Sequence, residues 1–137
     1  MESKVSRRDA LGTVALGTAL AAGMGFMRPA MAEFADTMIT QTASFGLNPE
    51  KKEEAKEAIL RLVKAVEEKE PGVLAYIPHF TEKDQVFFFE VYKDAETLQA
   101  HGKQPHMAEI KGAFASGALK MPLEVVKMSR IAGFYRV

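Results

Sequence analysis

Three consecutive phenylalanines, Phe87, Phe88 and Phe89, constrain the fold of this 137-residue chain more than any other feature. They lie in the stretch Gln85–Tyr92, where aromatic and β-branched residues predict a strand. Successive side chains of a strand point to opposite faces of a sheet, so Phe88 faces one side and its two neighbours face the other. Such a strand has to be buried on both faces, and the fold must supply a cover for each.

The other elements are predicted from the spacing of apolar residues and from turn residues. Strands are expected over residues 36–45, 73–80, 85–92 and 123–131. A first helix is expected to begin at Asn48-Pro49-Glu50, which offers a cap, a proline at the first helical position and an early acidic residue, and to end at Pro71-Gly72. Its apolar residues recur every three or four positions: Ala55, Ala58, Ile59, Leu62, Val63 and Val66.

A second helical region is expected to begin at Asp94, which can cap a helix. Ala95, Leu98 and His101 are spaced to share one face of it. Gly102 and Pro105 interrupt the helix before a further helical stretch, because proline cannot continue a helix and lacks a backbone donor. The inward residues of that stretch are predicted to be Met107, Ile110 and Phe114.

The element order is β-α-β-β-α-β, which matches the ferredoxin-like split motif of the α+β class. Two helices cover one face of such a four-stranded sheet, and the other face is left bare. Phe87 and Phe89 make that bare face apolar, so a second copy of the chain is expected to cover it. A homodimer also suits a domain of about a hundred residues without disulfides, whose single core gives marginal stability.

The first 32 residues differ in composition from the rest and are predicted to be a signal peptide. Basic residues near the start, including Arg7 and Arg8, precede an uncharged run from Leu11 to Met27, and Ala30-Met31-Ala32 is a small-x-small cleavage site. The run is too short and too rich in glycine for a stable membrane anchor. Ser6 to Leu11 resembles the twin-arginine signal, which predicts export to the periplasm or beyond and a functional domain over residues 33–137. An ordinary secretory signal is the alternative.

Charge and cysteine content exclude several classes of function. The leader holds four basic and two acidic side chains, which leaves 14 basic and 16 acidic side chains in residues 33–137 from totals of 18 each. No basic stripe is present to neutralise phosphates, so nucleic acid is not an expected partner. The chain has no cysteine, which excludes disulfides, thiolate nucleophiles and iron–sulfur ligation.

The three histidines, His79, His101 and His106, are the first candidates for proton transfer. His101 lies on the apolar face of its helix, where an ionisable group needs a partner or a ligand. A buried neutral histidine bonded to the backbone is the alternative. Pro105 separates His101 from His106, so the two cannot form the one-turn pair of zinc helices, and no metal is expected. No nucleotide-binding motif is present, and no organic cofactor is expected.

Two tyrosines on adjacent strands complete the candidate site. Tyr76 is placed with the catalytic residues, and Tyr92 lies beside Glu90, which is either a strand-end charge or a buried partner for a histidine. The expected substrate-binding residues are Glu90, Tyr92, Phe88, Met107 and Phe114. Met107 and Phe114 are core residues in the alternative interpretation.

Three segments together resemble the signature of the antibiotic biosynthesis monooxygenase domain family. The first is Glu90-Val91-Tyr92-Lys93-Asp94, the second is the helix from Ala95 that ends in Leu98-Gln99-Ala100-His101, and the third is Gln104-Pro105-His106-Met107. The element order agrees over nearly all of residues 36–131. The family is built as a dimeric α+β barrel, in which two sheets cover each other's bare faces.

The resemblance implies chemistry without a cofactor on quinols or similar enolisable aromatics, in which the deprotonated substrate itself reduces oxygen. Glu90, Tyr92, His101 and His106 match positions of the family signature. The absence of tryptophan speaks against the haem-degrading branch of the family. The alternatives are a dimer of the same fold that binds a small molecule without turnover, and an isomerase of a small carbonyl compound.

Overall fold

The computed structural model describes residues 36–134 and residue 136. The predicted signal peptide and its cleavage site lie outside the described residues. Within them the chain forms four strands and three α-helices, with a 3₁₀ turn before two of the helices. The strands are β1 (Ile39–Leu47), β2 (Val73–Phe80), β3 (Gln85–Tyr92) and β4 (Leu119–Met128). The helices are α2 (Lys52–Lys69), α3 (Ala95–His101) and α4 (Ala108–Ala115), and the 3₁₀ turns are η2 (Pro49–Lys51) and η3 (Pro105–Met107).

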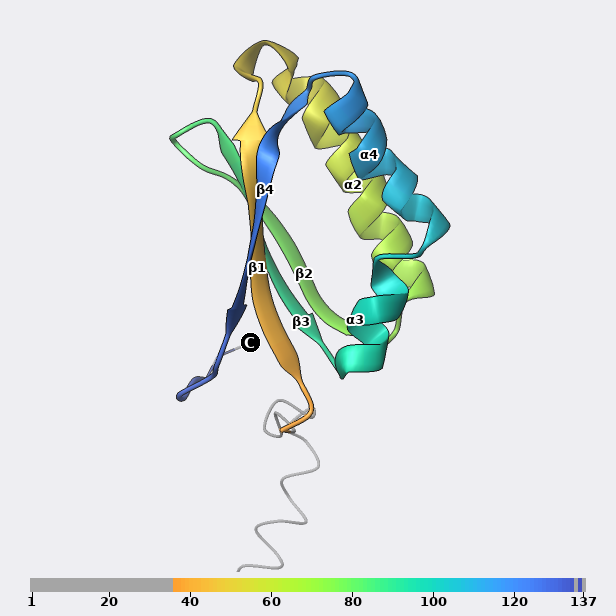
Figure 1. The fold of residues 1–137 in the computed structure, drawn as a ribbon, viewed down its shortest axis with the longest axis vertical. Coiled ribbons are helices and arrows are strands. Elements are labelled where there is room, and N and C mark those ends of the chain that lie inside the picture. The colour runs from red at the N-terminus through yellow and green to blue at the C-terminus, as the bar shows by residue number, and fades with distance from the viewer. Residues whose placement is uncertain (1–35, 135, 137) are drawn as a thin grey trace, which may run out of the picture. The chain divides into compact units, whose positions relative to one another are not determined.

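The four strands form one antiparallel sheet in the order β2-β3-β1-β4. The helices lie together on one face of this sheet, and no described element covers the other face (Figure 1). This arrangement confirms the predicted α+β, ferredoxin-like fold. Thr42 pairs with Phe89 and Ser44 with Phe87, so the two phenylalanines share the uncovered face with the polar residues of β1.

The bounds of β2 and β3 agree with the prediction, whereas β1 and β4 are shifted along the chain. β4 begins at Leu119 because a bulge near Ser44 and Gly46 allows Leu119 and Lys120 to pair with the end of β1. The hydrophobic alternation of the strand, which predicts a start at Leu123, carries no sign of this bulge. Ala95 is exposed rather than inward-facing, although His101 on the same helix is buried.

The first helical segment begins where predicted, as the 3₁₀ turn η2 that leads into α2, because Asn48 caps this turn and accepts a hydrogen bond from the Glu50 amide at 3.2 Å. The side chains along its inner face pack against β1 and β3. The buried residues of this core include Phe45, Leu47, Leu62, Val66, Val86, Phe88 and Leu119. One continuous core therefore joins the helical layer to the sheet.

The uncovered face is apolar, as predicted. Ile77 is 48 % exposed, Phe87 37 % and Val126 47 %, whereas Phe88 on the helical side is only 2 % exposed. These residues come from β2, β3 and β4, so the apolar surface runs across the sheet. None of the helices in residues 36–134 has the length and apolar character needed to span a membrane.

Candidate functional site

A buried carboxylate, Glu70, binds two histidines at one end of the helical layer. Nδ1 of His101 lies 3.1 and 3.0 Å from the two carboxylate oxygens of Glu70, and Nε2 of His106 lies 2.5 Å from Oε1. The side chains of Glu70 and both histidines are almost fully buried, at 4 and 7 % exposed respectively. The structure therefore brings together the two histidines that the sequence singled out, through a glutamate that it did not.

Glu70 and His101 both lie at the ends of helices. Glu70 is the C-cap of α2 and precedes Pro71-Gly72, where the chain turns into β2. His101 is the last residue of α3, a helix whose first turn is fixed by Asp94 accepting from the Thr97 amide at 2.8 Å. The end of α2 and the end of α3 therefore carry the two side chains that form this contact.

The close approach of these segments depends on Gly72. A Cβ atom at this position would lie 2.7 Å from both Cγ2 and Oγ1 of Thr97. The carbonyl of Gly72 also accepts a hydrogen bond from the Lys93 amide at 2.9 Å. A side chain at position 72 would therefore collide with Thr97, whose Oγ1 donates to Asp94 at 2.7 Å where α3 begins.

Two tyrosine rings flank His101. The ring centroids of Tyr76 and His101 are 5.1 Å apart, and those of Tyr92 and His101 are 5.4 Å apart. Tyr76 on β2 pairs with Glu90 on β3, which confirms that the two tyrosines lie on adjacent strands. The predicted catalytic residues His101, His106 and Tyr76 are thus gathered at one place, between the helices and the sheet.

Glu90 is buried but is not the partner of a histidine. Its Oε2 accepts hydrogen bonds from Nε2 of Gln41 at 2.7 Å and from the hydroxyl of Tyr92 at 2.9 Å. Neither interpretation offered by the sequence holds, since Glu90 is neither an exposed strand-end charge nor bonded to an imidazole. Its role in the structure is to fix the ring of Tyr92 beside His101.

The environment keeps both tyrosines protonated. Burial raises the pKa of Tyr76 far above its usual value, and the nearby Glu90 and Glu70 carboxylates add to the rise. Burial likewise raises the pKa of Tyr92, with the Glu90 carboxylate acting through both its charge and its hydrogen bond. The hydroxyl of Tyr76 is therefore available as a hydrogen-bond donor at any physiological pH.

Among the side chains of Tyr76 and the two histidines, three polar atoms have no hydrogen-bond partner in the described part of the chain: Nδ1 of His106, Nε2 of His101 and the hydroxyl oxygen of Tyr76. The last two belong to neighbouring rings, one an acceptor when the imidazole is neutral and the other a donor. Such a pair can bind a hydroxyl group or the oxyanion formed from it.

The remaining predicted substrate-binding residues are parts of the core. Phe88 packs on Tyr76 with ring centroids 4.9 Å apart, and Phe114 packs on Phe45 at 5.1 Å. Met107 and Phe114 are partly buried against the main core, and Met107 directly follows His106. Phe88 therefore contacts the site residue Tyr76, whereas Phe114 packs α4 against β1.

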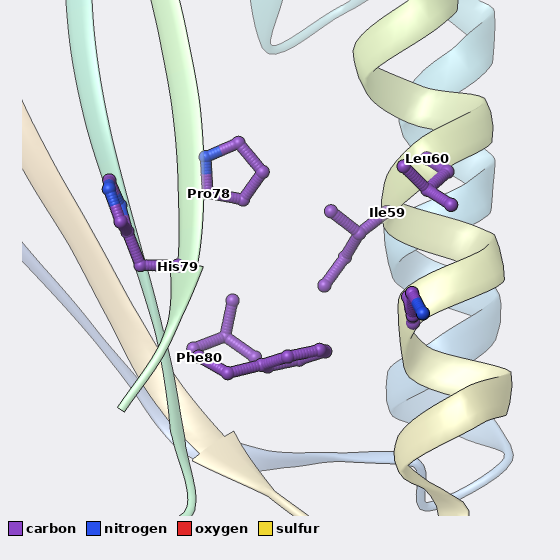
Figure 2. Close-up of a pocket in the computed structure, with 7 residues that line it drawn as sticks. Ile59, Leu60, Pro78, His79 and Phe80 are labelled. Carbon is purple, nitrogen blue, oxygen red and sulfur yellow. The ribbon is translucent and has the colours of Figure 1, made fainter. Parts of the chain in front are cut away.

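Two surface depressions on the described residues include neither His101 nor Tyr76. One, of about 140 Å³, opens between α2 and β2 and is lined by Ile59, Leu60, Pro78, His79 and Phe80 among others. Figure 2 shows Pro78 and Phe80 on the side of β2 that faces α2, with His79 on the other side. The second, of about 370 Å³, is lined by Glu70, Lys93 and Thr97 among others, so it borders Glu70 but neither His101 nor His106.

His79 does not join the other histidines. It lies beside Phe87 on the uncovered face of the sheet, with ring centroids 6.4 Å apart, and it is exposed. The three histidines therefore cannot converge on one ion. Across residues 36–134, no group of three histidine, cysteine or carboxylate side chains has an arrangement that could hold a metal.

Comparison of the sequence with models of protein families shows the family of this chain. The sequence model of the antibiotic biosynthesis monooxygenase family matches residues 38–113, more than half of the chain. The chain belongs to this family. The match includes Glu70, both tyrosines and both histidines of the site.

Solved structures agree with the fold of this monooxygenase-family domain. A Caulobacter crescentus protein assigned by name to the antibiotic biosynthesis monooxygenases superposes with a TM-score of 0.61 at 23 % identity, over 70 % of this chain and 92 % of the other. A conserved protein of unknown function from Bacteroides thetaiotaomicron gives a TM-score of 0.56 at 29 % identity, over 69 % of this chain and all of the other.

A second Bacteroides thetaiotaomicron protein, also assigned by name to the antibiotic biosynthesis monooxygenases, has a TM-score of 0.61 at 18 % identity, over 74 and 97 % of the two chains. No match to this chain was found among curated proteins. Family membership supports an enzyme of the monooxygenase type, and the solved structures support the fold.

Glu70 is the site residue that sequence reasoning missed. It follows Glu67, Glu68 and Lys69, which are exposed, and so it reads as part of a charged helix end. One signal could have found it, because Leu62, Val66 and Glu70 are spaced by four and continue one helix face. A carboxylate on the extension of a buried stripe needs a buried partner.

Proposed function

We propose that this domain is a monooxygenase that acts on a quinol or a similar enolisable aromatic and uses no cofactor. The observation that carries the proposal is the juxtaposition of His101 and Tyr76, whose Nε2 and hydroxyl groups lie on neighbouring rings and lack partners among the described residues. Family membership sets the reaction class, and these two atoms supply what a phenolic substrate requires.

His101 acts as the general base in this proposal. Its Nδ1 is engaged by Glu70, so Nε2 is the atom that accepts the proton of a substrate hydroxyl. The imidazolium so formed lies next to the Glu70 carboxylate, which stabilises its charge. A positioned base of this kind contributes roughly a hundred-fold or more to the rate.

Tyr76 stabilises the substrate anion. Because burial holds its pKa high, the hydroxyl remains a donor and can bind the oxygen that His101 has deprotonated. A donor fixed where negative charge develops stabilises that charge more than water does. The apolar surroundings supplied by Phe88 suit an aromatic ring.

The oxidation balances without a further reductant. A quinolate is electron-rich enough to pass electrons to O₂, and a bond forms between a ring carbon and one oxygen atom. The second oxygen atom leaves as water, and the quinol becomes a hydroxyquinone, so that quinol plus O₂ gives hydroxyquinone plus H₂O. The proton taken up at His101 returns in the water that is released.

A homodimer and an exported location complete the proposal. The apolar face of Ile77, Phe87 and Val126 fits a second copy of the same sheet, as in a dimeric α+β barrel. Residues 1–32 have the features of a twin-arginine-type signal, which supports a periplasmic or secreted enzyme.

A binding protein without turnover is the second candidate, and the burial of His101 favours it. The side chain is only 7 % exposed and lines neither of the two depressions, so little of the imidazole is open to a substrate. Oxygen consumption by the purified protein with a panel of reduced quinones separates the two functions. The monooxygenase consumes oxygen faster than the spontaneous reaction, whereas a binder retains the quinol without doing so.

A further inference from the structure

Glu70 is a buried carboxylate whose hydrogen-bond partners in the described part of the chain are two histidines. Both of its oxygens are used, since His101 approaches Oε1 and Oε2 and His106 approaches Oε1. No lysine or arginine of residues 36–134 forms an ion pair with it. A carboxylate removed from water in this way must be stabilised by N–H donors, because burial of an unpaired charge is costly.

This geometry dictates which nitrogen of each ring carries a proton. An ionised carboxylate only accepts hydrogen bonds, so Nδ1 of His101 and Nε2 of His106 must both donate. A neutral imidazole has one donor nitrogen and one acceptor nitrogen. The acceptor of His101 is therefore Nε2, the atom that faces away from Glu70.

We propose that Glu70 is a positioning residue that sets the tautomer of His101 and so presents Nε2 as the base. His106 acts through Glu70, because its N–H fixes the carboxylate in the orientation that His101 requires. The arrangement resembles in logic the aspartate of a serine-protease triad, which holds a histidine in the tautomer that catalysis needs and stabilises its imidazolium. The catalytic part of this inference rests on the proposed function, whereas the tautomer assignment does not.

The test is nitrogen-15 NMR of the histidine rings in the full-length protein, with assignment by single replacement of each histidine. Wild-type His101 is expected to show a protonated Nδ1 and a bare Nε2 when the ring is neutral. A wild-type spectrum with the proton on Nε2 overturns the proposal, whatever happens to the variants.

Glu70→Gln is the decisive variant, because its amide keeps the size of the side chain but removes the charge and one acceptor oxygen. At least part of the His101 population is expected to move its proton to Nε2, and the turnover number should fall about ten-fold or more with little change in KM. Glu67→Gln is the matched control, since Glu67 is exposed on the same helix. It should leave both spectrum and rate unchanged.

The outcomes separate this inference from the proposed function. If Glu70→Gln keeps the wild-type tautomer and rate, Glu70 is not a positioning residue. If the tautomer shifts as expected but wild-type protein oxidises no quinol, the proposed function fails and the tautomer assignment stands. If Glu70→Gln unfolds, the wild-type spectrum and the His106→Gln variant test the inference instead. Loss of the N–H group that His106 donates to Glu70 should leave the Glu70 side chain less ordered and His101 in a mixture of tautomers.

Discussion

His101 and Glu70 are 31 residues apart in the chain, yet Nδ1 of the histidine lies 3.0 Å from Oε2 of the glutamate inside the protein. The contact joins the end of α3 to the end of α2, and it is the reason why a histidine can be buried on an apolar helix face. The Nδ1–H group of His101 and the Glu70 carboxylate satisfy each other's hydrogen-bonding capacity away from water. The same contact orients the imidazole toward Tyr76.

Replacement of His101 by alanine is expected to lower oxygen uptake on the best quinol by roughly a hundred-fold or more, because the proposed base is removed. The fold should survive, at a cost of about 1–3 kcal/mol in the free energy of unfolding. Oxygen-electrode rates and melting curves test both points. His79→Ala is the control, since His79 lies on the other face of the sheet. Equal rates in wild type and His101→Ala would remove His101 from the mechanism, and loss of folding would make it a structural residue.

Tyr76 and Tyr92 are expected to resist ionisation until the protein unfolds. Burial and the Glu90 carboxylate raise the pKa of both, so the folded state favours the neutral phenol. Their contribution to stability is complete below about pH 10, where unfolded tyrosine titrates, and it is lost as the pH rises above that value. The variant Tyr135→Phe leaves only these two tyrosines in the chain.

Ultraviolet absorbance of tyrosinate and circular dichroism, followed together in an alkaline titration of Tyr135→Phe, test this prediction. Absorbance should rise only with the loss of secondary structure. Ionisation near pH 10 in a protein that is still folded would show that the fold does not raise the pKa of the two hydroxyls.

Local patterns in the sequence predict most of the fold. The alternation and turn residues around β2 and β3 give the observed bounds, and the cap at Asn48 starts the first helical segment as expected. β4 is displaced because its first residues pair through a bulge at Gly46. Such a bulge depends on the partner strand and leaves no trace in the strand's own hydrophobic pattern.

The site could be predicted only in part. Spacing and burial identify His101, and Pro105 places His106 in the turn that follows. The partner of both histidines depends on how α2 and α3 are oriented, which no local pattern contains. Glu90 illustrates the same limit, because its neighbours show that it is buried, whereas its bonds to Gln41 and Tyr92 come from pairing across strands.

The domain is predicted to form a homodimer through the uncovered face of the sheet. Each Å² of apolar surface removed from water contributes roughly 25 cal/mol, and Phe87 lies on a central strand of that face. Phe87→Asp should yield a monomer by light scattering at micromolar concentration. Leu60→Asp is the control, since Leu60 is 58 % exposed on α2 in the helical layer, and it should remain dimeric. A monomeric wild type would argue against the barrel.

Export is predicted to depend on the paired arginines of the leader. Replacement of Arg7 and Arg8 together by lysine should abolish accumulation outside the cytoplasm while leaving the fold intact, and exported wild-type protein should begin at Glu33. Cell fractionation and sequencing of the amino terminus measure these two outcomes. Normal periplasmic accumulation of the double variant would indicate an ordinary secretory signal instead.

The central claim is that a substrate anion formed at His101 reacts directly with O₂ and incorporates one of its oxygen atoms. The most direct test is the mass of the product formed from a quinol under ¹⁸O₂, with catalase-sensitive peroxide measured in the same sample. The account predicts a hydroxyquinone that carries one ¹⁸O atom and no accumulation of peroxide. A quinone without ¹⁸O, formed together with hydrogen peroxide or at the spontaneous rate, would contradict it.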